Sequence, residues 1–205
     1  MTIPILFADD SLIVVDKPAG LLSVPGRGDD KGDCVATRVQ ALHPDARVVH
    51  RLDMATSGLM LMARGAAAQR LLGIAFARRE VHKRYVAVVQ GRLAADRGEI
   101  DLPLLADWPN RPRQKVDTVA GKASLTRYRV LADGGPAGTS RLELEPITGR
   151  SHQLRVHLLA IGHPIVGDAL YGPGGGDRLL LHACELALLH PASGAPLRLH
   201  SEPPF

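Results

Sequence analysis

The sequence is poor in the features that mark exported or membrane proteins. Its only cysteines, Cys34 and Cys184, lie far apart and fit neither a disulfide framework nor the spacing of metal ligands. No apolar run approaches the roughly 18–20 residues that span a bilayer, and the first residues lack the basic and apolar regions of an export signal. These absences predict a cytoplasmic protein that does not cross a membrane.

Aromatic residues are also scarce. The 205 residues include one tryptophan, three tyrosines and three phenylalanines. A platform that stacks successive bases of a single strand needs several rings on one surface, so this composition argues against one. The apolar fraction of 45% and the charged fraction of 22% are those of an ordinary globular protein, and the length fits one domain.

Charge is unevenly distributed along the chain, although the formal net charge is only +4. Residues 64–84 and residues 111–129 each carry six Lys or Arg residues against one acid, whereas residues 1–33 carry six acids against three bases. Neutralising phosphates is the main source of non-specific affinity for nucleic acid, so a basic face would suit RNA. An ordinary solvated surface explains the same pattern equally well.

Hydrophobic patterning predicts more strands than helices. Strands are expected at 12–15, 59–63, 81–90, 124–131 and 141–145, and twice within 179–199 around a turn at 191–194. Helices are expected at 65–79 and at 151–161, where Leu154, Leu158 and Ile161 lie on one apolar stripe. A third helix, which carries Val35, Val39 and Leu42, is expected after Asp33 as its N-cap. Strict alternation of strand and helix is missing, so the fold class is α+β with a mostly antiparallel or mixed sheet.

Common cofactor and hydrolase motifs are not found. The glycine cluster at 172–176 lacks the pattern of a dinucleotide loop, residues 121–123 lack the rest of a P-loop, and no G-x-S-x-G elbow occurs. His152 and His157 are five residues apart and would point about 140° apart on a helix, unlike a metal-binding pair four residues apart. The sequence therefore predicts no bound metal or nucleotide.

A dense polar segment, His50–Leu59 (HRLDMATSGL), lies between apolar flanks. Thr56, Ser57 and Gly58 supply turn chemistry that could hold the Asp53 carboxylate in one orientation. From the residues alone, Asp53 is either part of a structural turn or ion pair, or a nucleophile.

Several blocks of sequence resemble one known family, and they occur in the order found in that family. These blocks are Asp16–Gly20 (DKPAG), His50–Leu59, Lys83–Ala87 (KRYVA), Thr148–His157 (TGRSHQLRVH), Gly162–Asp168 (GHPIVGD) and Leu179–Ala183 (LLLHA). Together they resemble the RluA family of pseudouridine synthases, from about residue 7 to residue 203. Leu21–Arg27, Met54–Thr56 and Asp107–Pro112 resemble the branch that acts on both tRNA and large-subunit rRNA. We expect no S4-type RNA-binding module, as found in larger relatives, before Asp9.

The resemblance implies the pseudouridine synthase fold, with a mixed, mostly antiparallel sheet flanked by helices and loops. Residues 1–205 are expected to form a single catalytic domain that acts as a monomer. The implied activity is isomerisation of specific uridines to pseudouridine in structured RNA, namely the tRNA anticodon stem-loop and 23S rRNA. The family needs no metal, nucleotide or organic cofactor for this reaction.

The resemblance also implies roles for individual residues. Asp53 matches the catalytic carboxylate, Arg155 the basic residue that pairs with it, and Tyr85 the active-site tyrosine that stacks on uracil. Arg51 matches a residue proposed to fill the space left by the flipped base. In the basic loop 108–115 we favour three residues as RNA contacts: Arg111, Arg113 and Lys115.

Simpler explanations remain open for each of these residues. Arg155 could pair with Glu143 or Glu145, and Tyr85 could be an ordinary core ring. His50 and His152 are more readily explained as structural hydrogen-bonding groups than as bases. For the whole protein, two alternatives are a non-catalytic RNA-binding factor on the same fold and a small hydrolase that uses Asp53 or Ser151 with His152.

Overall fold

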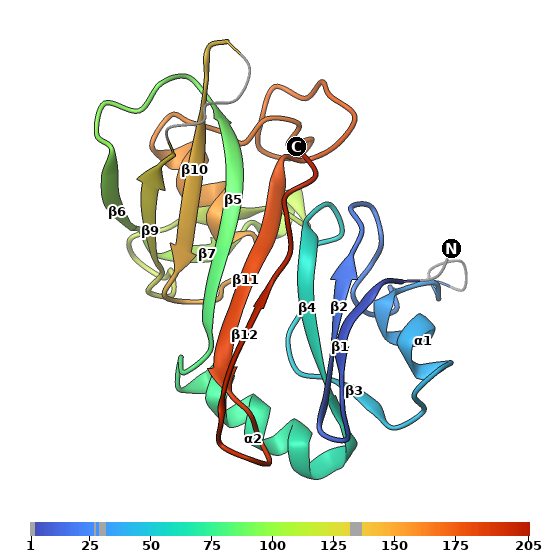
Figure 1. Cartoon of the computed structure of the whole chain (residues 1–205). Helices are drawn as coiled ribbons and strands as arrows, with labels where there is room; N and C mark the ends of the chain where they lie inside the picture. The colour runs from blue at the N-terminus through green and yellow to red at the C-terminus, as the bar shows by residue number, and fades with distance from the viewer. Residues whose placement is uncertain (1–2, 27, 29–31, 132–136) are drawn as a thin grey trace. The chain divides into compact units, whose positions relative to one another are not determined.

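The computed structural model describes residues 3–26, 28, 32–131 and 137–205 (Figure 1). Arg27, the last residue of the block Leu21–Arg27, lies outside the described residues. The chain divides into two compact units, one of residues 1–83 and 182–204 and the other of residues 84–181 with Phe205. Within the described ranges, no helix is long and apolar enough to cross a membrane.

The first unit is built on a sheet in which the strands follow the order β1, β2, β4 and β11, and β12 also pairs with β11. Their bounds are β1 Ile5–Ala8, β2 Leu12–Lys17, β4 Ser57–Arg64, β11 Leu181–Leu189 and β12 Pro196–His200, and β3 (Ala46–Val48) also pairs with β4. Among these pairs of strands, β4 and β11 run parallel and the others run antiparallel. The apolar runs at 12–15 and 59–63 are buried along their whole length, which confirms the strands predicted there.

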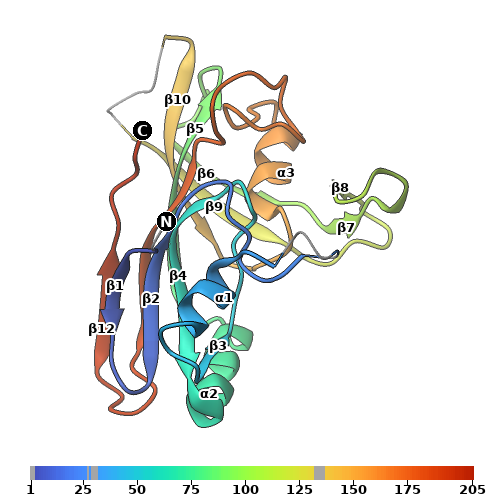
Figure 2. The same cartoon turned by 90° about the vertical axis from the view of Figure 1, so that its right-hand side faces the viewer.

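Two helices accompany this sheet (Figure 2). Helix α2 (Gly65–Ala77) packs Ala68 and Leu72 into an apolar cluster with side chains of β2, β4 and β11. It confirms the predicted helix but ends two residues earlier, because the backbone of Arg79 has a positive φ of 62°.

Helix α1 (Val35–Gln40) corrects one prediction. Cys34 caps it instead of Asp33: the Cys34 sulfur accepts the N–H of Thr37, and the Thr37 hydroxyl in turn accepts the N–H of Cys34. Asp33 forms a salt bridge with Arg38 at 2.7 Å, and the helix ends before Leu42, which is exposed.

The second unit contains an antiparallel sheet in the order β5, β10, β9, β6. Its elements are β5 His82–Gln90, β6 Arg97–Asp101, β9 Leu125–Val130, β10 Thr139–Pro146, helix α3 Gln153–Ala160 and the hairpin of β7 (Leu104–Ala106) and β8 (Gln114–Val116), with the short 3-10 turn η2 (Trp108–Asn110) at its tip. In β10, Leu142 and Leu144 are fully buried, as the alternating pattern predicts. The α+β class with a mixed, mostly antiparallel sheet is confirmed.

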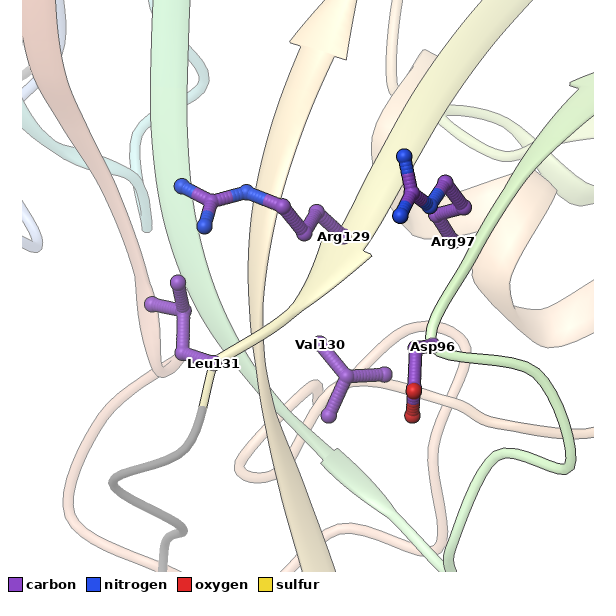
Figure 3. Close-up of a pocket in the computed structure, with 5 residues that line it drawn as sticks. All are labelled: Asp96, Arg97, Arg129, Val130 and Leu131. Carbon is purple, nitrogen blue, oxygen red and sulfur yellow. The ribbon is translucent and has the colours of Figure 1, made fainter.

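A surface pocket of about 350 Å³ lies beside the adjacent strands β6 and β9 (Figure 3). Its lining consists of Asp96, Arg97, Arg129, Val130 and Leu131. The guanidinium of Arg129 is already engaged with the Glu143 carboxylate at 3.1 Å. None of the seven site residues expected from the sequence lines this pocket, so it is not the predicted site.

Candidate active site

Asp53 lies in the loop between β3 and β4, and its side chain is half-buried. Its carbonyl accepts the N–H of Thr56 at 3.1 Å, which closes the turn that the sequence predicts. Arg51, two residues earlier on the same loop, is exposed. One loop therefore carries both the Asp53 carboxylate and the Arg51 guanidinium, which are two residues apart in the sequence.

The backbone on both sides of Asp53 is held by residues that follow β2. On one side, the Ser23 hydroxyl donates to the carbonyl of Leu52 at 2.7 Å and accepts its N–H at 3.1 Å. On the other, the carbonyl of Met54 accepts the N–H of Gly20 at 2.9 Å. These bonds fix the direction in which the Asp53 side chain leaves the backbone, and a reacting carboxylate has to be placed in this way.

Lys17 strengthens this arrangement from inside the unit. Its side chain is fully buried, and its ammonium donates to the carbonyls of Pro18 at 2.9 Å, Leu21 at 2.7 Å and Met54 at 2.9 Å. An ammonium has three donors, and these three bonds use all of them. The lysine of the DKPAG block thus joins its own turn to the carbonyl of Met54, the residue that follows Asp53.

Replacing Lys17 by Met should remove these bonds, so that the carbonyl oxygens of Pro18 and Leu21 lose this donor while that of Met54 keeps the N–H of Gly20. We expect the free energy of unfolding to fall by about 2–4 kcal/mol, measured by urea denaturation. Lys122→Met, at an exposed position, is the control and should change it by less than about 0.5 kcal/mol. Equal stability of the two variants would contradict the role of Lys17.

His50 holds the start of the same loop. Its Nε2 accepts the N–H of Leu61 on β4 at 2.9 Å, and its ring stacks on Phe76 of α2 with 4.7 Å between the ring centres. Burial, aided by the positive charge of Lys83, lowers the pKa of His50 to about 3, so the ring is neutral at physiological pH. His50 is a structural hydrogen-bonding group, as expected.

A chain of buried side chains holds the other end of the loop, where β4 begins. Ser57 contacts Nδ1 of His182 at 2.8 Å, Nε2 of His182 contacts Ser201 at 3.0 Å, and the Ser201 hydroxyl donates to Asp16 at 2.9 Å. Because Ser201 donates its one proton to Asp16, it accepts from Nε2 of His182. These bonds connect the start of β4 to β11 and to Asp16 of β2.

Gly58 allows β4 and β11 to approach each other beside this chain. Its φ is +108°, and a Cβ atom at this position would collide with the backbone of Ala183. Only glycine fits both the backbone angle and the contact. The Thr56–Ser57–Gly58 segment is thus constrained by β11 as well as by its own turn.

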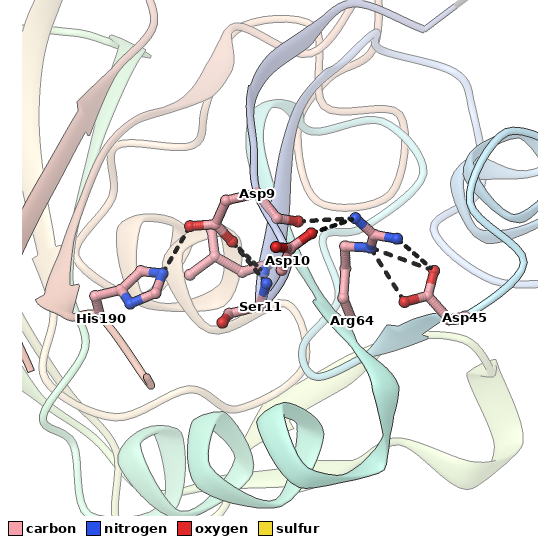
Figure 4. A network of polar contacts seen from close by, with 7 residues as sticks. Asp9, Asp10, Ser11, Asp45, Arg64 and His190 are labelled. Carbon is pink, nitrogen blue, oxygen red and sulfur yellow. Dashed lines mark hydrogen bonds and ion pairs between the residues drawn. The ribbon is translucent and has the colours of Figure 1, made fainter. Parts of the chain in front are cut away.

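A further polar network lies at the opposite end of β4, around Arg64 (Figure 4). Arg64 pairs with Asp45 at 3.1 Å and donates to the carbonyl of Asp9 at 3.0 Å. The Asp9 carboxylate accepts N–H groups of Ser11 and Leu12 and contacts His190 at 2.7 Å. Burial raises the pKa of Asp9, but these hydrogen bonds outweigh it and hold the pKa below its usual value. These bonds connect the turn at Asp9 to Asp45, Arg64 and His190 within the first unit.

In the second unit, Arg155 of α3 is buried and forms a bidentate ion pair with Asp168. Its Nε and Nη2 each lie 2.7 Å from a different oxygen of the Asp168 carboxylate. The suggested partners are engaged elsewhere: Glu143 pairs with Arg84 and Arg129, and Glu145 with Arg127. The idea that Arg155 simply pairs with Glu143 or Glu145 is therefore wrong.

Asp168 is the partner of Arg155 that the sequence analysis did not identify. Burial raises its pKa, but the hydrogen bond and charge of Arg155, with N–H groups of Leu170 and Tyr171, outweigh burial and lower the pKa below its usual value. The carboxylate therefore stays ionised and fixes the Arg155 guanidinium. Its position in the GHPIVGD block was the available signal.

Tyr171 connects several groups of this unit. Its hydroxyl lies 2.7 Å from Nδ1 of His152 and accepts the N–H of Gln114 at 2.7 Å, while the Arg155 guanidinium lies 5.1 Å from its ring centre. His152 is thus a hydrogen-bonding partner of Tyr171, which agrees with the structural role expected for it. Tyr85, on β5, is half-buried and pairs with Leu144 in the register of β10.

The three basic residues favoured as RNA contacts lie at the tip of the β7–β8 hairpin or just after it. Arg111 lies over the ring of Trp108, with its guanidinium carbon 4.3 Å from the ring centre. Arg113 donates to the carbonyl of Leu170, and Lys115 pairs with Asp117 at 3.5 Å. All three are exposed, although Arg113 is also tied to its own unit.

Within residues 3–26, 28, 32–131 and 137–205, no group of three His, Cys, Asp or Glu side chains is placed to hold a metal ion. Asp53 and Arg51 belong to the first unit, and the other five expected site residues belong to the second.

Comparison with known proteins identifies the family. The sequence profile described as RNA pseudouridylate synthase matches residues 11–160, a span that includes Asp53, Tyr85 and Arg155. The chain belongs to the RNA pseudouridine synthase family. This synthase is therefore an isomerase that converts uridine in RNA to pseudouridine.

Individual relatives agree with this assignment. The synthase is 51% identical over 205 residues to the "Dual-specificity RNA pseudouridine synthase RluA" of Yersinia pestis, a match covering 98% of this chain and 99% of that protein. The protein of the same name from Escherichia coli (strain K12) is 52% identical over 194 residues, which cover 93% of this chain and 88% of that protein. The solved structure of Human RNA Pseudouridylate Synthase Domain Containing 1 is similar with a TM-score of 0.83 and 30% identity, covering 100% of this chain and 84% of that chain.

Proposed function

We propose that this synthase modifies uridines in both tRNA and large-subunit rRNA, with the tRNA anticodon stem-loop and 23S rRNA as the substrates. The proposal is supported by the relatives of about 50% identity that are named dual-specificity RNA pseudouridine synthases. It is also supported by the blocks Met54–Thr56 and Asp107–Pro112, which resemble the branch acting on both RNAs.

Asp53 is the catalytic carboxylate in this proposal. The observation that carries it is the fixed backbone on both sides of Asp53, with the carbonyl of Leu52 bound by Ser23 and the carbonyl of Met54 bound by Lys17 and Gly20. Such a carboxylate can be held in one orientation toward a reacting nucleotide. The reaction breaks the C1′–N1 bond and forms a C1′–C5 bond; C5 loses its proton and N1 gains one, so substrate and product are isomers.

Arg155 and Tyr85 assist this carboxylate. Arg155 supplies the positive charge that keeps the catalytic carboxylate ionised, and its own orientation is set by the bidentate pair with Asp168 at 2.7 Å. Tyr85 stacks on the uracil and helps to remove the C5 proton. Its half-buried position on β5 leaves part of the ring exposed for such a contact.

Arg51 fills the space that the flipped uridine leaves in the RNA. A guanidinium plane both stacks and donates hydrogen bonds, and Arg51 is exposed only two residues from Asp53. Arg111, Arg113 and Lys115 bind the RNA through their positive charge. We further propose that both units act together as one catalytic domain, in a monomer that works in the cytoplasm.

Release of tritium from RNA labelled at uracil C5 tests the proposed function, because the C5 proton is lost when the new bond forms. We expect release from both a tRNA transcript and a large-subunit rRNA fragment, and none from either RNA with Asp53→Asn. Release from one RNA alone would contradict dual specificity. Release from neither, with a folded protein that still binds RNA, would instead support a non-catalytic RNA-binding factor.

A further inference from the structure

The tip of the β7–β8 hairpin, residues 107–113, is closed by its own hydrogen bonds. Backbone bonds of 3.0 Å join Asp107 to Asn110, Asn110 to Arg113 and Arg113 back to Asp107, and the Asn110 amide donates to the Asp107 carboxylate at 2.9 Å. Figure 2 shows the hairpin standing out from the sheet and α3 of its unit. The tip is therefore an ordered structure that projects into solvent.

Trp108 is the exposed side chain of this tip. It is 65% exposed. Burial would stabilise a large apolar ring, so an exposed tryptophan indicates a surface that binds a partner. The guanidinium of Arg111 covers one ring face at 4.3 Å, too close for a base to enter between them. The opposite face of the ring can therefore receive a planar partner.

The base of the tip is fastened to the segment that holds Arg155. Arg113 donates to the carbonyl of Leu170 and lies 5.6 Å from the ring centre of Tyr171, whose hydroxyl accepts the N–H of Gln114. Leu170 and Tyr171 also donate their N–H groups to the carboxylate of Asp168, the partner of Arg155. A ligand seated on the tip is thus placed at a fixed position relative to Arg155.

We propose that Trp108 binds one unpaired nucleobase of the substrate RNA, by stacking on the ring face opposite Arg111. The Trp108 ring holds the Arg111 guanidinium in place through a cation–π contact. The positive charge of this guanidinium attracts the RNA phosphates next to the stacked base. This is an anchor for one base, and it needs no multi-ring platform. The inference rests on the proposed function and adds a second contact point, separate from the uridine that reacts.

Trp108 is the single tryptophan of the chain, so its fluorescence reports on this site directly. In the Asp53→Asn protein, which binds RNA without turnover, we expect an anticodon stem-loop RNA to quench the fluorescence, with saturation at the RNA affinity. A fully paired RNA duplex is expected to leave it nearly unchanged. No quenching at saturation by the stem-loop, or equal quenching by the duplex, would overturn the proposal.

Kinetics give a second measurement in the otherwise unaltered synthase. Trp108→Ala should raise the KM for tritium release about 5- to 150-fold, the range for losing one stacked base, while kcat at saturating RNA stays the same. Trp108→Phe should restore most of the affinity. Leu189→Ala, which alters a side chain equally exposed at 65% but in the other unit, is the control and should leave KM unchanged.

A KM for Trp108→Ala within twofold of the unaltered synthase would overturn the proposal. Failure of the proposed function looks different, because the unaltered synthase would then release tritium from one RNA alone or from neither. In that case the fluorescence titration still decides whether Trp108 stacks on an unpaired base.

Discussion

Replacing Asp53 by Asn is expected to lower the rate of pseudouridine formation at least about 1,000-fold, with folding and RNA affinity nearly unchanged. The amide has the shape of the carboxylate but carries no negative charge, and it can act neither as a base nor as an efficient nucleophile. The carbonyls of Leu52 and Met54, the chain neighbours of Asp53, are held by Ser23, Gly20 and Lys17, so we expect the substitution to leave the loop in place. Single-turnover tritium release measures the loss.

Two variants make this test specific. Asp45→Asn removes a carboxylate of the same unit that pairs with Arg64 at the surface, and it should retain full activity. Asp53→Glu keeps the charge but moves it by one methylene, and we expect a loss of about 100-fold, since misplacement by about 1 Å is costly. Activity of Asp53→Asn above one tenth of the unaltered rate would remove Asp53 from the mechanism.

Replacing Asp168 by Ala should destabilise the protein by about 3–5 kcal/mol, the largest stability loss that we expect from one substitution. The variant leaves the Arg155 guanidinium, 5% exposed, without the carboxylate that compensates its charge. Differential scanning calorimetry and urea denaturation measure the loss. Glu99→Ala breaks a surface pair with Arg127 of similar length, 2.8 Å, and as the control should cost less than about 1 kcal/mol. Equal losses would show that burial of the Arg155–Asp168 pair is unimportant.

The same pair should make stability depend on acid. The pKa of Asp168 is lower in the folded protein than its usual value, because Arg155 and two N–H groups outweigh burial. Its stabilising contribution is therefore complete above about pH 4 and is lost as the pH falls through the folded pKa. In Asp168→Asn, the loss of stability between pH 5 and pH 3 should be smaller than in the unaltered protein.

Patterns that repeat over several residues predicted the framework of the fold. The continuous apolar runs of β2 and β4 identify strands that are buried on both faces of the sheet. The alternating residues of β10 identify a strand that is buried on one face. Single side-chain choices were less predictable. Asp is a better helix cap than Cys in general, but Arg38 binds Asp33 and the Thr37 hydroxyl completes the cap with Cys34.

The candidate site shows the same contrast between what the sequence predicts and what it does not. Motif residues could be named from the sequence, yet their partners could not. Asp168 reaches Arg155 because the chain folds back after α3. The sequence alone does not distinguish Asp168 from Glu143 or Glu145 as the ion-pair partner of Arg155. The acceptors of Lys17 are backbone carbonyls, which every residue has, so no sequence pattern distinguishes the three that it binds.

The bond between Ser57 and His182 joins residues 125 positions apart, and the adjoining pairing of β4 with β11 spans the same distance. During synthesis on a ribosome, the loop that carries Asp53 would leave the exit tunnel long before β11 is made. Contacts of such high sequence separation form late, because a long stretch of chain must first be ordered. A nascent chain would thus hold every residue of the HRLDMATSGL block and still lack its support from β11, so an unfinished polypeptide would be inactive toward the RNA that surrounds it.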